Sequence, residues 1–116
     1  MFARLMGLKT VSPRRLHQRM QEEPLTVIDV NLRGSWVAAR VRGALNLDPT
    51  GFDDGDLPAD KGSPLVFYCS NFMCTKAPKA ARRAAAMGYR CVEVMSAGIK
   101  GWLDAALPTE SGEVAA

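Results

Sequence analysis

Residues 64–87 read PLVFYCSNFMCTKAPKAARRAAAM, an apolar run followed by a polar loop and an alanine-rich segment. The apolar run at residues 64–68 predicts a buried strand, which Cys69 follows directly. The alanines in residues 76–87 favour a helix with a small-residue face, and Gly88 is a typical C-terminal residue for such a helix. A strand, a loop and a helix in this order are the unit of a parallel α/β sheet.

Strand and helix patterns also alternate on both sides of this unit. Ser12 is a typical N-cap and Pro13 a typical first helical residue, so a helix is expected from Ser12 to about Gln21. The other expected elements are a buried strand at residues 25–30, a short helix at 34–39, a short strand at 43–47, a loop at 48–63, a strand at 90–95 and a short helix at 98–103. We therefore predict one α/β domain over residues 1–116, with its core at about residues 10–108, a mostly parallel sheet, helices on both faces and a flexible tail at 109–116.

Length and composition fit one ordinary globular domain. The chain has 116 residues, of which 47% are hydrophobic and 23% charged, enough for one core and too few for two domains. The formal net charge of +3 comes from short basic groups without interleaved aromatic residues, which favours small anions over nucleic acid as partners. No apolar stretch is long enough to span a membrane, and the apolar start at residues 1–8 is too short for a secretory signal. We therefore expect a cytoplasmic protein with no nucleic-acid or membrane partner.

The cysteine and histidine content limits the chemistry. Cys69, Cys74 and Cys91 are an odd number of cysteines, so a structural disulfide framework is not expected. His17 is the only histidine, which excludes the usual zinc ligand sets within one chain and leaves one residue for a Cys–His pair. We interpret His17 as a solvated residue on the surface of the first helix and Cys91 as part of the core. The two tryptophans are also expected in the core.

Cys69 lies where the predicted strand meets the start of the predicted helix. In sheets of this kind, ligands bind beyond the carboxyl ends of the strands. Backbone N–H groups of the loop, the helix dipole and the charge of Lys76 favour a thiolate at Cys69, and the same donors can hold a tetrahedral anion such as thiosulfate, phosphate or arsenate. The candidate loop residues are Ser70, Asn71, Phe72, Met73, Cys74, Thr75 and Lys76, with Thr75 as a candidate helix cap. The alternative is that Cys69 is a small apolar residue that ends a strand.

A series of short motifs has the order and spacing of a known family. They are Ser12-Pro13, Val27-Ile28-Asp29-Val30, Gly43-Ala44-Leu45-Asn46-Leu47, Val66-Phe67-Tyr68-Cys69, Ala80-Ala81 through Gly88-Tyr89, and Ala97-Gly98 with Gly101-Trp102 before Leu107-Pro108. Through these motifs, residues 11–108 resemble the rhodanese-like domain family of single-domain sulfurtransferases. The resemblance implies a central five-stranded parallel sheet, Cys69 as the sulfur-carrying nucleophile and Asp29 as the acidic residue at a strand end.

The family resemblance also implies an activity. The cysteine takes a sulfane sulfur from a donor such as thiosulfate, becomes a persulfide and passes the sulfur to cyanide or a thiol. This chemistry needs no metal and no organic cofactor, and the chain has no dinucleotide motif. The expected partners are a small sulfur-containing anion and an acceptor, either a small thiol or a protein that docks on Phe72 and Met73.

The active-site loop departs from the usual family pattern. Cys74 stands five positions after Cys69, where a basic residue is usual, and the loop is about two residues longer than the common sulfurtransferase form. Asn31 and Leu32 stand in place of an Arg and a Glu, and residues 39–42 stand in place of a Gly-His-Ile-Pro stretch. The two arginines of this last stretch, Arg40 and Arg42, either rim the pocket or are solvated.

These departures leave alternatives open. Cys74 is either a thiol that resolves a persulfide or sulfenate on Cys69 or an uncharged loop residue. The alternatives to a sulfurtransferase are a non-turnover binding or redox-sensing module that uses both cysteines, and arsenate or phosphate chemistry in the enlarged loop. Lys76 is the first basic residue of the loop and lacks the two-pronged phosphate grip of an arginine. We interpret Asp29 as a support that ties neighbouring loop N–H groups together rather than as a catalytic group.

Overall fold

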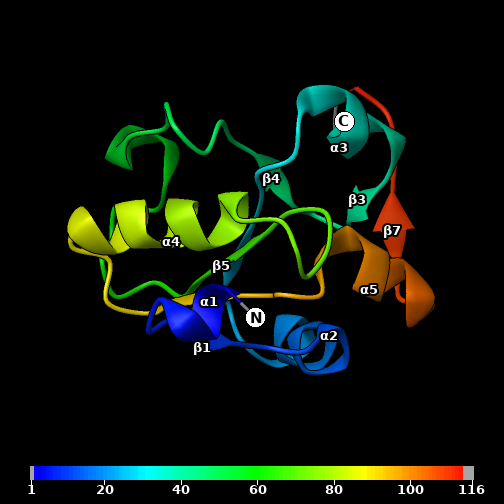
Figure 1. The fold of residues 1–116 in the computed structure, drawn as a ribbon, viewed down its shortest axis with the longest axis horizontal. Coiled ribbons are helices and arrows are strands. Elements are labelled where there is room, and N and C mark those ends of the chain that lie inside the picture. The colour runs from blue at the N-terminus through cyan, green and yellow to red at the C-terminus, as the bar shows by residue number, and fades with distance from the viewer. Residues whose placement is uncertain (1, 114–116) are drawn as a thin grey trace.

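A parallel sheet forms the centre of the molecule in the computed structural model, which describes residues 2–113 (Figure 1). Its strands, in spatial order, are β1 (Lys9–Thr10), β6 (Val92–Val94), β5 (Leu65–Tyr68), β2 (Thr26–Asp29) and β4 (Leu45–Asn46). Every neighbouring pair in this five-stranded sheet is parallel. The predicted α/β fold with a central five-stranded parallel sheet is therefore confirmed.

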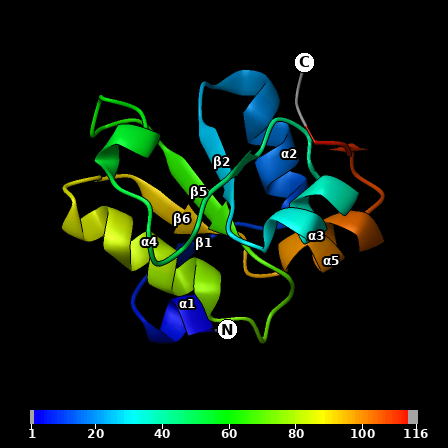
Figure 2. The ribbon, with the colours of Figure 1, turned by 90° about the horizontal axis from the view of Figure 1, so that it is seen from above.

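Helices cover both faces of the sheet, as predicted (Figure 2). They are α1 (Phe2–Leu5), α2 (Pro13–Glu22), α3 (Arg33–Ala38), α4 (Lys76–Ala86) and α5 (Gly98–Asp104), with a short 3-10 helix, η1 (Asp54–Asp56), in the long loop before β5. Buried residues of α1 and α4 share one hydrophobic cluster, and those of α2 and α5 share the other. Within residues 2–113, no helix is long and apolar enough to cross a membrane.

The alternation of side chains along β5 explains the two clusters. Leu65 and Phe67 point to the face covered by α4, whereas Val66 and Tyr68 point to the face covered by α2 and α5. All four side chains are buried, because a parallel strand in the middle of a sheet is covered on both sides. This burial fixes the register of β5 and so the place where Cys69 leaves the sheet.

The small-residue face of α4 brings this helix close to the sheet. Ala77, Ala80, Ala81 and Ala84 are buried in the cluster that also contains β5 and β6 residues, and they recur at the spacing of one helix face. Because these side chains are small, the helix backbone approaches the strands closely. The first turn of α4 therefore lies beside Cys69, where Ala77 and Cys69 line the same cavity.

The N-terminal segment adds two elements that the sequence patterns did not predict. β1 pairs with β6 and forms one edge of the sheet. Ala3 of α1 is buried in the same cluster as the alanines of α4. With four residues in α1 and two in β1, neither element is long enough to show a hydrophobic period.

The prediction of a flexible tail at residues 109–116 is wrong at its first residues. These form β7 (Thr109–Glu110), which pairs antiparallel with β3 (Arg40–Val41) in a second, two-stranded sheet. The Glu110 carboxylate accepts hydrogen bonds from Arg40 Nε at 3.2 Å and from the Gly43 backbone at 2.9 Å. These charge-assisted contacts hold the segment against the domain. Residues 114–116 of the predicted tail lie outside the described residues.

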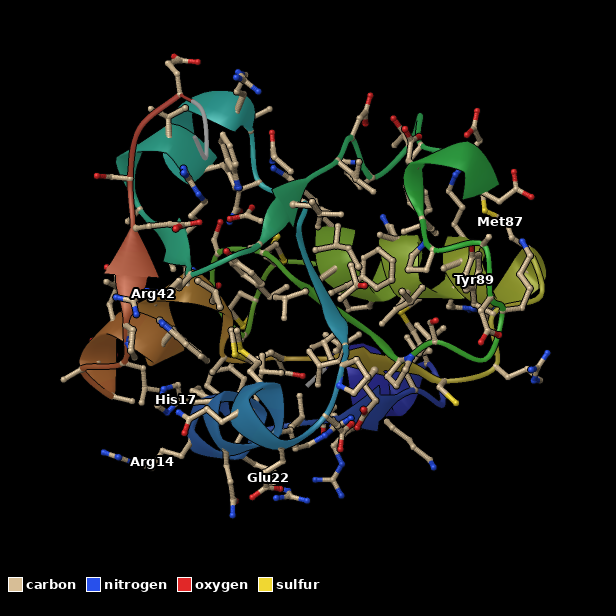
Figure 3. All side chains as sticks on the ribbon, turned by 180° about the vertical axis from the view of Figure 1, so that it is seen from behind. Arg14, His17, Glu22, Arg42, Met87 and Tyr89 are labelled. Carbon is tan, nitrogen blue, oxygen red and sulfur yellow. The ribbon has the colours of Figure 1, made fainter. Side chains whose placement is uncertain are left out.

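Arg40 is buried, so both interpretations offered for it, pocket rim and solvated surface, are wrong. The residue is 1% exposed, and its guanidinium lies 3.8 Å from the centre of the Trp36 ring. It donates hydrogen bonds to the carbonyls of Trp36 and Gly112 and so ties α3 to the C-terminal segment. Arg42 is exposed (Figure 3), and both tryptophans are buried, as predicted.

His17 and Cys91 also differ from expectation. His17 on α2 (Figure 3) is half-buried, and its ring meets the ring of Trp102 on α5 edge-on, with the ring centres 5.9 Å apart. Cys91 is exposed rather than part of the core, because β6 begins only at Val92 and Cys91 lies in the connection before it. Cys91 therefore lies at the amino end of the sheet, opposite to the end at which Cys69 lies.

Candidate active site

The candidate site is the loop of residues 69–75 between β5 and α4, beyond the carboxyl end of β5 (Figure 1). The first residues of α5 hold the start of this loop. The backbone N–H of Ile99 donates to the Cys69 carbonyl at 2.9 Å, and that of Lys100 donates to the Ser70 carbonyl at 3.1 Å. Cys69 therefore lies between the first turns of α4 and α5.

Gly98 allows the close contact between α5 and the loop. It has a positive φ of 66°, and a Cβ at this position would lie 2.5 Å from the Ser70 carbonyl carbon and 2.7 Å from the Asn71 nitrogen. Glycine avoids both the strained conformation and the clash with the backbone. The Ala97-Gly98 motif of the sequence thus lets α5 support the active-site loop.

Hydrogen bonds within the loop turn Cys74 back toward Cys69. The Cys74 backbone N–H donates to the Asn71 carbonyl at 3.2 Å, and the Asn71 side-chain oxygen accepts from the Met73 backbone N–H at 2.9 Å. Asparagine forms such local turns readily. As a result, Cys74 packs against the hydrophobic cluster that contains Cys69, and the two free cysteines line one small cavity.

Cys69 is 3% exposed, and this burial has the largest effect on its ionisation. Burial and the neighbouring Cys74 raise the pKa of Cys69 to about 12, against the lowering effect of the backbone N–H groups of Ala77 and Ser70. These N–H groups are the kind of donor that the sequence predicted for this sulfur, but they do not outweigh burial. The resting site therefore favours the thiol form of Cys69, which differs from the expected thiolate.

Cys74 carries the more acidic thiol of the pair. Burial opposes its ionisation, but the Cys69 thiol, the backbone N–H groups of Lys76 and Ser70, and the charge of Lys76 together lower the pKa of Cys74. Because the two thiols interact directly, they share the first negative charge of the loop. That charge resides first on Cys74, with the Cys69 thiol beside it as a proton donor.

A cavity of about 10 Å³ lies beside both sulfurs, a volume that holds about one water-sized group. Its walls come from the loop, from Ala77 in the first turn of α4 and from Val94 and Ser96 at the end of β6. The Ser96 hydroxyl is buried and finds no hydrogen-bond partner among the residues that the structure describes. Sequence reasoning missed Ser96, because a serine after a strand is common in loops and carries no specific signal.

The buried Asp29 carboxylate links the strand ends beside the loop. It accepts a hydrogen bond from the Tyr68 hydroxyl at 2.6 Å and another from the Asn31 backbone N–H at 2.8 Å. Burial raises the pKa of Asp29, although both hydrogen bonds act to lower it. The bond to Asn31 is the kind of link to a neighbouring N–H group that we predicted for Asp29.

Asn31 extends this network to the active-site loop. Its side-chain oxygen accepts a hydrogen bond from the Ser70 hydroxyl at 2.9 Å, and its carbonyl accepts one from the Asn46 side chain at 2.9 Å. The Val41 backbone N–H donates to the Tyr68 hydroxyl at 3.1 Å. Sequence reasoning missed the roles of Asn31, Asn46 and Tyr68, although the place of Asn31 just after a buried strand was an available signal.

The remaining predicted site residues are mostly exposed, although Phe72 also lines the cavity. Phe72 and Met73, on which we expected an acceptor protein to dock, are 57% and 66% exposed, and Lys76 is also exposed. Thr75 is the N-cap residue of α4, but its side chain caps no backbone N–H of the described residues, so the expected capping is wrong. In the part of the chain that the structure describes, no three His, Cys, Asp or Glu side chains gather as a metal site.

The fold and this loop define a class of protein. The family model of the rhodanese-like domain matches residues 12–105, which is most of the chain. The chain therefore belongs to the rhodanese-like domain family, as its sequence motifs indicated. An uncharacterised protein of Synechocystis is 24% identical over 100 residues, which are 86% of this chain and 55% of that protein. The chain thus spans about half the length of the curated relative that it matches.

Solved structures share the fold at low sequence identity. The thiosulfate sulfurtransferase of Pseudomonas aeruginosa superposes with a TM-score of 0.80 and 22% identity, over 91% of this chain and 20% of that chain. A 3-mercaptopyruvate sulfotransferase of Escherichia coli gives a TM-score of 0.77 and 17% identity, over 92% and 52% of the two chains. A Rhodopseudomonas palustris protein, described as a possible tyrosine phosphatase, gives 0.71 and 18%, over 90% and 86%. At such identities these similarities show the fold alone.

Proposed function

We propose that this protein is a thiosulfate sulfurtransferase-like enzyme that carries sulfane sulfur as a persulfide on Cys69. The sulfur comes from thiosulfate or a persulfide donor and goes to a thiol or cyanide. The observation that carries this proposal is the position of the Cys69 sulfur, buried at the end of the central strand and facing the backbone N–H groups of Ser70 and Ala77. Membership of the rhodanese-like domain family and the fold shared with sulfur-transferring enzymes support the same chemistry.

Loading of the site begins with removal of the Cys69 proton. The Cys74 thiolate lies beside this proton and accepts it in the wild type. In a variant without Cys74, solvent accepts the proton, and the loss of Cys74 also removes one of the causes that raise the pKa of Cys69. The Cys69 thiolate then attacks the outer sulfur of thiosulfate. A new sulfur–sulfur bond forms, and the bond to the central sulfur breaks with its electron pair leaving on sulfite. The N–H groups of Ser70 and Ala77 stabilise negative charge at the reacting sulfur.

In the second half-reaction, an acceptor attacks the outer sulfur of the persulfide. Cyanide or a thiol takes the sulfur, and the Cys69 thiolate is restored. The exposed Lys76 attracts a small sulfur-containing anion, and Phe72 and Met73 offer apolar contacts to an acceptor protein or a small thiol. The chain supplies every group that this scheme uses, so the proposal includes no cofactor. We also propose that the enzyme acts in the cytoplasm.

The test is the intact mass of the protein after incubation with thiosulfate and, separately, with polysulfide. It is made on Cys74→Ser, which leaves Cys69 without a neighbouring thiol, and on double variants that also carry Cys69→Ser or Cys91→Ser. We expect a gain of one sulfur atom in Cys74→Ser and in the variant that also lacks Cys91. We expect no gain in the variant that also lacks Cys69. No gain in Cys74→Ser with either donor would contradict the proposal.

Arsenate or phosphate chemistry in the enlarged loop is a second candidate function. The length of the loop and the fold similarity to the Rhodopseudomonas palustris protein favour it. Lys76, however, offers a point charge and not the paired N–H groups with which an arginine grips phosphate. We expect no hydrolysis of p-nitrophenyl phosphate above background, and hydrolysis that disappears in Cys69→Ser would favour the second candidate.

A redox-sensing or binding module without turnover is the remaining alternative. The direct interaction of the Cys69 and Cys74 thiols favours it. This alternative predicts a Cys69–Cys74 disulfide after treatment with peroxide and no release of sulfite from thiosulfate. The sulfurtransferase proposal predicts sulfite release, so a sulfite assay on the reduced protein distinguishes the two.

A further inference from the structure

We propose that Cys74 resolves the Cys69 persulfide and releases its outer sulfur as hydrogen sulfide. In this reaction Cys74 takes the place of an external acceptor, and the protein is left with a Cys69–Cys74 disulfide. The inference rests on the proposed function, because the persulfide has to form first. It assigns to the same loop a second activity, the thiol-dependent reduction of sulfane sulfur to sulfide.

The geometry of the loop favours an internal nucleophile over an external one. Cys69 is 3% exposed, and the cavity beside its sulfur, of about 10 Å³, holds about one water-sized group. The outer sulfur of a persulfide is a group of that size. Cys74 already forms part of the cavity wall. It therefore has the advantage of proximity that an intramolecular reaction provides.

The loop also holds Cys74 in place and favours its reactive form. The Cys74 N–H donates to the Asn71 carbonyl at 3.2 Å, which turns the residue toward Cys69. In the free-thiol protein, burial opposes the ionisation of Cys74, and the Cys69 thiol lowers the pKa of Cys74. The backbone N–H groups of Lys76 and Ser70 and the charge of Lys76 also lower it, and these groups stay in place when Cys69 carries the extra sulfur. Because the thiolate is the nucleophilic form of cysteine, Cys74 is prepared to attack a sulfur beside it.

The leaving groups decide which sulfur of the persulfide Cys74 attacks. Attack on the outer sulfur expels the Cys69 thiolate, which is a poorer leaving group than hydrosulfide because burial and the neighbouring Cys74 raise the pKa of Cys69 to about 12. Attack on the inner sulfur, Sγ of Cys69, expels hydrosulfide, the conjugate base of a stronger acid. Thiols of lower pKa leave faster in such exchanges. The reaction therefore releases hydrosulfide and does not move the sulfur from Cys69 to Cys74.

Atoms and electrons balance in this step. The Cys74 thiolate and the protonated Cys69 persulfide give the Cys69–Cys74 disulfide and one hydrosulfide ion. The sulfane sulfur is reduced, and the two cysteine sulfurs are oxidised to the disulfide. Two external thiols then reduce this disulfide and are themselves oxidised to a disulfide. Over one cycle, thiosulfate and two thiols give sulfite, hydrogen sulfide and one external disulfide.

The test is a single turnover of the reduced 116-residue chain with one equivalent of thiosulfate, without oxygen or external thiol. Sulfite release reports persulfide formation, sulfide release reports its resolution, and intact mass reports the state of the cysteines. The proteins are the wild type, Cys74→Ser, Cys74→Ala and, as a matched control at an exposed cysteine, Cys91→Ser. We expect the wild type and Cys91→Ser to release one sulfide for each sulfite and to lose two hydrogens. We expect both Cys74 variants to keep one extra sulfur and to release sulfide only at background.

The possible results separate the inference from the proposed function. Sulfite release with a stable persulfide and no sulfide in the wild type overturns the inference and leaves the proposed function intact. If both Cys74 variants release as much sulfide as the wild type, the inference is also overturned, because the sulfide then forms without Cys74. No sulfite from the wild type and no extra sulfur in either Cys74 variant overturns the proposed function and the inference together. Because the test uses both Cys74→Ser and Cys74→Ala, it can still be made if one of these variants does not fold.

Discussion

The two ends of the parallel sheet each carry a cysteine, in very different surroundings. Cys69 follows β5 at the carboxyl end and is 3% exposed, whereas Cys91 precedes β6 at the amino end and is exposed. At the carboxyl end, α4 and α5 begin, and their first turns enclose Cys69 with backbone N–H groups. At the amino end, α4 has already ended and Cys91 remains open to solvent. A cysteine is thus surrounded by the backbone N–H groups of a binding site where strands end and helices begin.

The largest expected difference between the two ends is in activity, when Cys69 or Cys91 is replaced by serine. We expect Cys69→Ser to lower thiocyanate formation from thiosulfate and cyanide to background, because the nucleophile is lost. We expect Cys91→Ser to keep the wild-type rate. The coloured iron complex of thiocyanate measures both rates. Equal losses in the two variants would mean that the surroundings of the cysteine do not define the site.

Glycine-to-alanine substitutions are expected to cost more stability at the carboxyl end of the sheet than at the amino end. We expect Gly98→Ala to lower the free energy of unfolding by about 2–4 kcal/mol, since its Cβ would lie 2.5 Å from the Ser70 carbonyl carbon. Gly62→Ala, near Cys91, is the control, because its Cβ would lie 2.9 Å from Nη2 of the flexible Arg90 side chain. We expect it to cost less than about 1 kcal/mol. Urea denaturation measures both changes, and a tolerated Gly98→Ala would contradict the close packing of α5 on the loop.

Loss of a tyrosine hydroxyl is expected to have a smaller effect, again larger at the carboxyl end. Tyr68→Phe leaves the buried Asp29 carboxylate without its 2.6 Å hydrogen bond, which we expect to cost about 1–3 kcal/mol of unfolding free energy. Tyr89→Phe removes a 2.6 Å hydrogen bond to the carbonyl of Pro58, which we expect to cost about 0.5–1.5 kcal/mol. Denaturation curves of both variants measure the difference. A larger loss of unfolding free energy in Tyr89→Phe would show that the hydrogen bond to the Asp29 carboxylate stabilises the protein less than the hydrogen bond to the Pro58 carbonyl.

The stability of the carboxyl end is expected to depend on pH through Asp29. Because burial raises the pKa of Asp29, the folded protein binds a proton at this carboxyl more readily than the unfolded chain. The contribution of Asp29 to stability is therefore full below the unfolded pKa and is lost as the pH rises through the folded pKa. We expect the wild type to gain unfolding free energy relative to Asp29→Asn between about pH 7 and about pH 4. Denaturation at the two pH values measures this change, and a loss on acidification would show that the folded pKa is lowered.

The smallest expected effect at the carboxyl end concerns Ser96. Its buried hydroxyl finds no partner among the described residues, and removal of such a group is neutral or stabilises by up to about 1 kcal/mol. We therefore expect Ser96→Ala to unfold at the same or a slightly higher temperature than the wild type. A clear loss of stability in calorimetry would show that the hydroxyl has a partner in solution.

The main elements of the fold were predictable because their signals are local. The apolar run at residues 64–68 occurs as β5 (Leu65–Tyr68), and the alanine-rich residues 76–87 occur as α4 (Lys76–Ala86). The elements that were missed, α1, β1, β3 and β7, have two to four residues each. β7 depends on the contact of Glu110 with Arg40, seventy positions apart in the chain, and no local pattern reveals such a contact.

The location of the site was predictable, but its electrostatics were not. The loop residues lie together because they are adjacent in the sequence. The ionisation of Cys69 depends on how deeply tertiary packing buries it and on the turn that brings Cys74 beside it. Asn31 and Ser96 follow β2 and β6, which flank β5 in the sheet, so their presence at the site depends on the strand order. Local sequence patterns predict single strands and helices, but they do not predict the order of the strands in the sheet.

The most direct test of the account is the position of the transferred sulfur in the chain. Cys74→Ser is loaded with thiosulfate, alkylated and digested, and the peptides that contain Cys69 and Cys91 are examined by mass spectrometry. We expect an extra sulfur on the Cys69 peptide and an unmodified thiol on the Cys91 peptide. An extra sulfur on Cys91, on both peptides equally or on neither would contradict the assignment of Cys69 as the sulfur carrier.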